Sequence, residues 1–236
     1  MINIVILAAG LGSRLGRDIP KPLTELADGR TIMQQQVDNI NEAFGEKNIN
    51  LNIVVGYKLE LIIEARPDAS FIYNESYDMT NTSKSLMRAL KALPSNEGVL
   101  WLNGDVVFNP EILKKAAKLI AKDQSFVAVD TSSVGEEEVK YTTDAEGFID
   151  NISKIIDTDS ALGEAVGINY ISSTDNKTLQ YWLKKVNDND YFEKALELAI
   201  KTDKVLIQPF DISSRGWYAV EVDFEEDLQR ANLVAI

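Results

Sequence analysis

Short, continuous apolar runs alternate with amphipathic segments over the first 130 residues of the chain. The first run, Asn3 to Ala9, is followed by Gly10, which is typical of a strand buried on both faces. The same reading of apolar runs and helical spacing predicts strands at about 51–55, 70–73, 98–102 and 125–130, and helices at about 31–45, from Thr82 onward, and at 110–122. This alternation of strand and helix predicts an α/β fold with a largely parallel sheet.

The pattern changes after residue 130. A hairpin that turns at 144–147 is predicted within 134–155. Beyond it the chain predicts strands at 166–171, 205–210 and 217–222, and helices at 173–186, 190–201 and 224–233. No repeat, low-complexity stretch or linker separates the two halves. We therefore expect a single domain over 1–236, in which residues of about 131–215 form a small lobe built onto the same sheet.

The composition removes several kinds of chemistry. Among 236 residues there is no cysteine and no histidine, which excludes disulfides, thiolate catalysis, histidine bases and histidine metal sites. The net charge of −13 argues against a nucleic-acid or anionic-membrane partner. No apolar segment approaches the roughly 20 residues that span a bilayer, and no basic region precedes the first strand, so we expect a cytoplasmic protein. Catalysis must use carboxylates, lysine, arginine, hydroxyls, backbone amides or a hard cation.

A glycine-rich turn follows the first strand. Residues 7–16 read LAAGLGSRLG, and PKPL follows at 20–23. At the carboxyl end of such a strand, a turn of this kind lets backbone amides approach phosphates closely. A dinucleotide fingerprint fits poorly, because the third glycine comes one position late and Arg14 and Lys21 add cations that such a loop does not need. A Walker A loop is absent, and a tight turn with solvated cations stays open as a purely structural alternative.

Two acids follow predicted strands. Asp105 comes after the strand at 98–102, and Asp223 comes after the strand at 217–222, just before a predicted helix. Mg²⁺ prefers one or two carboxylates together with substrate phosphates. A turn-forming role for Asp105 and a helix-capping role for Asp223 are the structural alternatives.

The two halves of the glycine segment, L-A-A-G-x-G-x-R and P-K-P-L, resemble the signature of the sugar-phosphate nucleotidyltransferase superfamily, the MobA-like NTP transferases. The resemblance implies a Rossmann-like nucleotidyltransferase fold, with a mixed, mostly parallel sheet flanked by helices. It implies that Arg14 and Lys21 are catalytic and hold phosphate oxygens, and that Asp105 and Asp223, the latter chosen over Glu221, hold Mg²⁺. The residues that it implies for nucleotide binding near this turn are Leu7, Ala8, Ala9, Gly10, Gly12, Ser13 and Gly104.

The segment at 74–86, NESYDMTNTSKSL, resembles one in small cytidylyltransferases for phosphocholine, aminoethylphosphonate and related acceptors. This resemblance implies that Asn81 and Ser85 lie near the base and ribose, although Thr80 or Asn81 as a helix cap is the alternative. Lysines of the second half are expected near the acceptor phosphate, and acids and aromatic residues near an ammonium group. The candidates for acceptor binding are Lys140, Lys154, Glu164, Trp182, Tyr191 and Glu193, each with a structural role as the alternative.

The sequence thus predicts a Mg²⁺-dependent cytidylyltransferase that transfers CMP from CTP to a small phosphate or phosphonate acceptor and releases pyrophosphate. No side chain needs to act as a base, because a phosphate dianion is already nucleophilic. A sugar-1-phosphate nucleotidyltransferase that uses UTP or dTTP, and a nucleotide-binding regulator without turnover, stay open as alternatives. A homodimer also stays open as the state of assembly.

Overall fold

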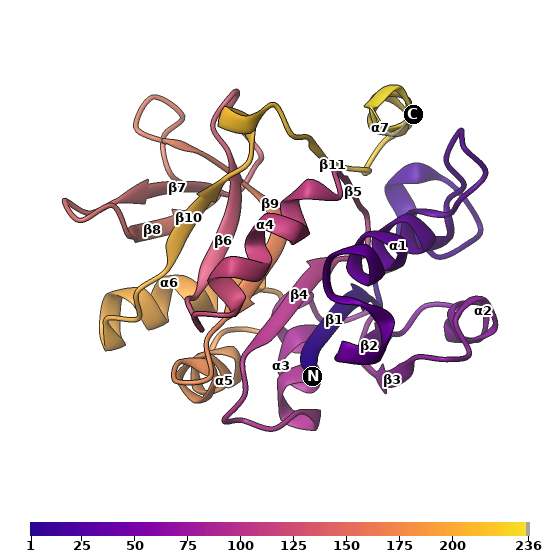
Figure 1. Cartoon of the computed structure of the whole chain (residues 1–236), viewed down its shortest axis with the longest axis horizontal. Helices are drawn as coiled ribbons and strands as arrows, with labels where there is room; N and C mark the ends of the chain where they lie inside the picture. The colour runs from indigo at the N-terminus through magenta and orange to yellow at the C-terminus, as the bar shows by residue number, and fades with distance from the viewer. Residues whose placement is uncertain (235–236) are drawn as a thin grey trace.

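One nine-stranded sheet runs through both halves of the chain in the computed structural model, which describes residues 1–234 (Figure 1). The strands follow the order β10-β6-β9-β4-β1-β2-β3, and the hairpin of β7 and β8 joins at β9. Their bounds are β1 Ile2–Ala8, β2 Ile49–Val55, β3 Ser70–Tyr73, β4 Val99–Asn103, β6 Phe126–Asp130, β7 Lys140–Thr143, β8 Ile149–Ser153, β9 Gly163–Ile171 and β10 Gln208–Asp211.

The sheet is mixed and mostly parallel, which confirms the predicted fold class. β1 pairs in parallel with β2 and β4, β2 with β3, and β6 with β10. β9 is antiparallel to β4 and β6 and joins the two parallel sets. Because β1 and β4 are parallel neighbours, their carboxyl ends meet at one edge of the sheet, where ligands bind in folds of this kind.

Helices cover both faces of the sheet (Figure 1). On one face lie α1 (Ile32–Phe44) and α4 (Glu111–Ile120), and α1 buries the helically spaced stripe Met33, Val37 and Ile40. The other face is covered by α3 (Thr82–Ala92), α5 (Asn176–Lys185) and α6 (Phe192–Asp203). Burial of these apolar stripes, at about 25 cal/mol per Å², is the main force that holds the layers together.

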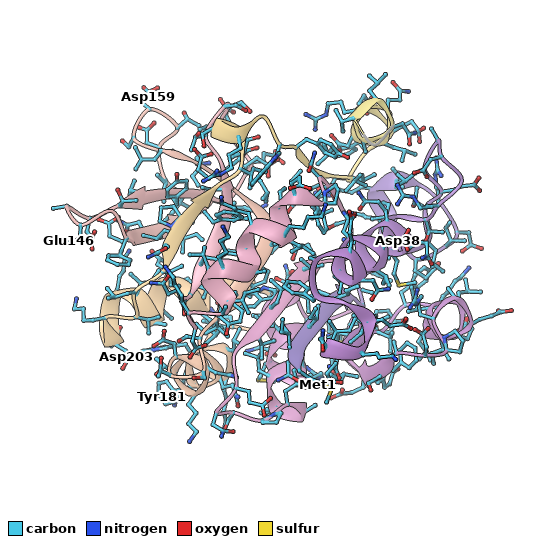
Figure 2. All side chains as sticks on the ribbon, in the orientation of Figure 1. Met1, Asp38, Glu146, Asp159, Tyr181 and Asp203 are labelled. Atoms are coloured by element: carbon cyan, nitrogen blue, oxygen red, sulfur yellow. The ribbon has the colours of Figure 1, made fainter. Side chains whose placement is uncertain are left out.

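Two features that the sequence pattern did not predict are the short helix α2 (Leu59–Ala65) and the short strand β5 (Val106–Phe108). β5 pairs with β11 (Ala219–Glu221) in a separate two-stranded sheet, and α7 (Glu225–Val234) follows it. The hairpin of β7 and β8 is confirmed, and Figure 2 shows Glu146 at its tip and Asp159 at the tip of the next loop. Within residues 1–234, no helix combines the length and the apolar character needed to cross a membrane.

Candidate active site

The glycine turn and the end of β4 lie against each other. The backbone N–H of Gly104 donates to the carbonyl oxygen of Leu7 at 3.0 Å, and a Cβ at position 104 would lie 2.6 Å from that oxygen. Glycine is therefore required for this close approach. The turn is also fixed from the side of β2, because the N–H of Tyr57 donates to the carbonyl of Ala9 at 3.1 Å.

The glycine turn folds back over Lys21. Gly12 has a φ of +61°, in the left-handed region that favours glycine, and a Cβ there would lie 3.2 Å from the Cβ of Lys21. Lys21 begins a single 3₁₀ turn, Lys21–Leu23, whose Pro22 is buried. The P-K-P-L segment thus anchors the lysine backbone, and the side chain extends toward the ends of β4 and β11.

Pairing of β5 with β11 brings the two predicted acids together. Glu221 is the register partner of Val106, and the N–H of Val222 donates to the carbonyl of Asp105 at 2.9 Å. Asp223 is the next residue, so its carboxylate lies beside that of Asp105. Asp227 of α7 accepts hydrogen bonds from the N–H groups of Asp223 and Phe224 at 3.1 and 2.8 Å and fixes the turn after the strand.

Two cations contact these acids. The ammonium of Lys21 donates to Asp105 at 2.9 Å and to Asp223, while Arg14 donates to Asp223 at 3.0 Å. Burial alone would lower the pKa of Lys21, but Asp105 and Asp223 outweigh it and the pKa is raised. For Asp223, burial favours the neutral form, but Lys21 and Arg14 outweigh it and the pKa is lowered. The pairing therefore favours the charged forms of both Lys21 and Asp223.

The pair of carboxylates suits a divalent cation. Both already coordinate the same positive charge, the ammonium of Lys21, which marks the point where two carboxylate oxygens converge. Mg²⁺ is commonly bound by one or two carboxylates with phosphate oxygens and water completing the shell. Among residues 1–234, no group of three or more acids, cysteines or histidines forms a metal cage.

A cavity of about 430 Å³ opens over this cluster and extends toward the second half of the chain. Of the residues predicted from sequence, those that line it are Leu7, Ala8, Gly10, Gly12, Arg14, Lys21, Asn81, Gly104, Asp105, Lys154, Tyr191, Glu193 and Asp223. After the roles predicted from the sequence, we call the part around Arg14, Lys21, Asp105 and Asp223 the nucleotide end, and the part around Lys154, Tyr191 and Glu193 the acceptor end.

Two residues predicted for nucleotide binding do not line the cavity. Ala9 is buried, and its carbonyl is used by Tyr57. Ser85 is also buried, and its hydroxyl accepts a hydrogen bond from Asn74 at 3.0 Å. Asn74 also contacts Thr80, so Ser85 shapes the turn that carries Asn81. The side chain of Ser13 lies outside the described part of the structure.

Asn81 is both a helix cap and a residue of the cavity lining, and its role in nucleotide binding stays a prediction. Its side chain accepts a hydrogen bond from the N–H of Thr82 at 2.8 Å and caps α3, and the residue also lines the cavity.

Three residues predicted for acceptor binding also lie outside the cavity lining. Lys140 is buried and donates to the carbonyls of Glu136 and Glu138 at 2.6 and 3.2 Å. Glu164 accepts from the N–H of Gly135 at 2.9 Å, and burial raises its pKa. These two side chains hold the loop before β7 in place, and that loop brings Glu138 to the cavity.

Trp182 is the third of these residues. Its indole N–H donates to Asp203 at 2.6 Å and ties α5 to α6. Figure 2 shows its neighbour Tyr181 on the outer surface of α5. The indole therefore serves the contact between two helices.

The cavity also contains acids that the sequence analysis missed or set aside. Glu221 lines it, accepts from Asn103 at 3.2 Å, and has a pKa raised well above its usual value by burial and by the charge of Asp105. Gly167 makes room for it, because a Cβ there would lie 2.9 Å from Oε1 of Glu221. Glu138 is a further acid of the lining. The one signal for Glu221 in the sequence was its place in the predicted strand at 217–222, two residues before Asp223.

The acceptor end combines one aromatic face, one cation and one buried acid. Nζ of Lys154 lies 4.8 Å from the ring centroid of Tyr191. Glu193, in the first turn of α6, is 8% exposed, and burial raises its pKa to about 7 while Lys154 opposes that rise. The residues come from the loop after β8 and from the start of α6, which α6 packing on β8 brings together.

The model of the MobA-like NTP transferase domain matches residues 4–170 of the chain. Among curated proteins, the bifunctional protein GlmU of Neisseria meningitidis is 28% identical over 222 residues, covering 90% of this chain and 47% of that protein. CMP-5'-(3-aminopropyl)phosphonate synthase of Streptomyces rubellomurinus is 35% identical over 125 residues, covering 49% of this chain and 19% of that protein. The chain spans about half the length, or less, of the curated relatives it matches.

Solved structures share the fold over the whole chain. CTP:phosphocholine cytidylyltransferase from Streptococcus pneumoniae superposes with a TM-score of 0.78 at 17% identity, covering 100% of this chain and 99% of the other. An inositol-1-phosphate CTP transferase from T. maritima gives 0.77 at 19%, covering 100% and 95%. A UDP-glucose pyrophosphorylase gives 0.74 at 19%, covering 100% and 98%. At these identities the likeness establishes the fold.

Proposed function

The chain belongs to the MobA-like NTP transferase domain family and carries a nucleotidyltransferase domain; on this premise we propose that it transfers CMP from CTP to a small phosphate- or phosphonate-bearing acceptor and releases pyrophosphate. The observation that carries the proposal is the convergence of Lys21, Arg14 and the carboxylates of Asp105 and Asp223 beside the glycine turn. A triphosphate needs cationic side chains beside its phosphates and carboxylates that can hold a metal ion, and this cluster has both. We assign the acceptor to the part of the cavity built by residues of about 131–215.

In the proposed reaction, an oxygen of the acceptor's phosphate or phosphonate attacks the α-phosphorus in line. The new bond joins this oxygen to the α-phosphorus, and the bond to the α–β bridging oxygen breaks, so pyrophosphate leaves with that electron pair. No general base is needed, because such an acceptor is largely a dianion at neutral pH, with a second pKa of about 6. This agrees with a chain that has no histidine.

Lys21 and Arg14 would neutralise the oxygens of the α-phosphate as charge builds up on them, and the backbone at Gly10 and Gly12 would orient the triphosphate. Asp105 and Asp223 would hold a divalent cation, which we propose to be Mg²⁺. When bound, such a cation neutralises phosphate charge and orients substrate oxygens. A phosphoryl-type transfer of this kind is catalysed mainly by positioning and charge stabilisation.

Several observations support CTP and a small acceptor. The name of the Streptomyces relative refers to a CMP-linked aminoalkylphosphonate, and the names of two structures with this fold refer to CTP. Asn81 lines the cavity and can hydrogen-bond a base edge. Retention of Lys21, Asp105 and Asp223 together also argues against a regulator without turnover, which would not need the full set.

The test is pyrophosphate release by the purified chain with Mg²⁺, measured for CTP, UTP and dTTP against 2-aminoethylphosphonate, phosphocholine and a hexose-1-phosphate. We expect release with CTP and one of the first two acceptors. Release only with a hexose-1-phosphate would move the chain to the sugar-1-phosphate branch. Nucleotide binding without release for any pair would contradict the proposed activity.

A further inference from the structure

Glu193 has a buried carboxylate oxygen at the wall of the cavity. The side chain lines the cavity, and its Oε2 has no hydrogen-bond partner among residues 1–234. An unsatisfied buried acceptor is costly, and native structures seldom keep one without a reason. Glu193 therefore stands out among the acids of the cavity as a group that lacks its partner.

Glu197, one turn further along α6, shows how this helix satisfies a buried glutamate. Glu197 is 7% exposed, close to the 8% of Glu193. Its two carboxylate oxygens receive the ammonium groups of Lys194 at 2.7 Å and Lys201 at 2.6 Å. Among residues 1–234 no donor plays the same part for Oε2 of Glu193, and the cavity is the space from which a ligand can supply one.

The charges around Glu193 favour a cation as that ligand. Lys154 is the cation that acts on it, and it lies over the ring of Tyr191 without a hydrogen bond to Glu193 in the described structure. Glu138 and Glu221 add two further acids to the same cavity. Beyond the nucleotide end the cavity thus has three acids and one lysine, and a bound ammonium group favours the charged form of the two acids whose pKa is raised, Glu193 and Glu221.

The aromatic lining argues for a particular kind of ammonium. Quaternary ammonium groups are recognised by aromatic cages. Tyr191 and Phe192 are the aromatic residues among those that line the cavity. The face of Tyr191 is already covered by Lys154. Phe192 is 1% exposed and packs edge-on against Trp101 at 5.5 Å, so these two rings do not form an aromatic cage. A primary ammonium, in contrast, has three N–H donors for a carboxylate.

We propose that Glu193 determines acceptor specificity by accepting a hydrogen bond from a primary ammonium, so that the site selects aminoalkyl phosphates or phosphonates over their trimethylammonium counterparts. This inference rests on the proposed function. A trimethylammonium has no N–H to give to Oε2, and its methyl groups hold its charge away from the carboxylate. A site built around a donor discriminates strongly against an analogue that lacks it, because its own polar group is then left unpaired.

The experiment compares phosphoethanolamine with phosphocholine, which differ only by three N-methyl groups, in steady-state transfer from the nucleotide that supports turnover. We expect the wild-type chain to prefer phosphoethanolamine by about 100-fold or more in kcat/KM. Glu193→Gln removes the charge and should lower kcat/KM for phosphoethanolamine by about 10- to 100-fold, mainly through KM. The same variant should change kcat/KM for phosphocholine by less than about 3-fold.

Glu197→Gln is the matched control, because it removes an equally buried carboxylate of the same helix outside the cavity; the ratio between the two acceptors should stay at its wild-type value. Equal use of both acceptors by the wild-type chain overturns the inference without the need for any variant. An equal loss for both acceptors in Glu193→Gln overturns it too. Transfer without discrimination leaves the proposed function intact, whereas no transfer to any acceptor refutes the proposed function and this inference with it.

Discussion

The carboxylates at the two ends of the cavity differ in whether they are paired. At the nucleotide end, each acid is paired: Lys21 joins Asp105 to Asp223, and Arg14 binds Asp223. At the acceptor end, Oε2 of Glu193 has no partner in the described chain, and burial raises its pKa. The nucleotide end is thus balanced before a substrate binds, while the acceptor end is incomplete. We infer that the charged groups of the nucleotide end exchange partners when a substrate binds, whereas Glu193 at the acceptor end gains a partner.

The largest effect is expected at the nucleotide end, from Lys21→Ala. This change removes the ammonium that we assign to the α-phosphate, so kcat should fall by about 10³-fold, the scale of losing one main charge stabiliser. Pyrophosphate release measures it. Lys118→Ala, an exposed lysine of α4, is the control and should keep wild-type turnover. Near-normal kcat in a folded Lys21→Ala protein would refute the assigned role.

The next effect concerns the acids that we assign to the cation. Asp105→Asn and Asp223→Asn each remove one charged ligand, so kcat should fall by about 10²-fold and half-maximal activity should require more Mg²⁺. A metal titration of activity measures both quantities. Glu226→Gln, an exposed acid on α7, should leave the titration unchanged. The account fails here if both variants titrate like the wild-type chain.

A smaller effect is expected where the two ends meet, at Gly167. Its φ is +70°, and a Cβ would lie 2.8 Å from Nδ2 of Asn103 and 2.9 Å from Oε1 of Glu221. Gly167→Ala should therefore displace Glu221 and lower kcat/KM by about 10-fold. It should also lower the free energy of unfolding by about 1 kcal/mol, because alanine would be held in a left-handed backbone conformation. Gly216→Ala has the same φ with open space around it, so it should show the strain alone. Equal kinetics in the two variants would exclude a role for the displacement.

The last expected effect, at the acceptor end, is one of stability and not of turnover. Glu193 has a pKa of about 7 when folded and 4.5 as its ordinary value. Between these values the folded state binds more protons than the unfolded state, so the free energy of unfolding falls as pH rises from about 4.5 to 7. Lys154 and Glu221 are the charged groups that act on this carboxyl.

Glu193→Gln removes this titration, so the variant should gain stability over the wild-type chain as pH rises from 5 to 8, by at most about 3 kcal/mol. Thermal melting at a series of pH values measures the gain. A constant difference between the two proteins across that range would contradict the raised pKa.

The sequence predicted the nucleotide end better than the acceptor end, and the reason is physical. The glycine turn, Lys21 and Asp105 depend on local backbone geometry next to buried strands, which a single sequence reveals. The nearness of Asp223 to Asp105 depends on β5 pairing with β11. β11 lies within the strand predicted at 217–222, but β5, with three residues, is too short to give a pattern. Their functional roles remain predictions.

The acceptor end depends on contacts between distant segments. Lys140 looked like a phosphate ligand, yet it turns inward to two carbonyls of its own loop. Trp182 was predicted to lie near an ammonium group of the acceptor, yet its indole N–H donates to Asp203 and links two helices. Residue type does not show which way such side chains point, because packing against remote helices decides it. Tyr191 and Glu193 line the cavity because α6, which begins beside them, packs against β8.

The most direct test of the central claim is a crystal structure of the chain with Mn²⁺ and a non-hydrolysable CTP analogue, in which anomalous scattering locates the metal. The account predicts one metal peak bound by the carboxylates of Asp105 and Asp223 and by the triphosphate, with Lys21 and Arg14 on phosphate oxygens. A triphosphate bound away from the glycine turn, or a metal that contacts neither acid, would contradict it.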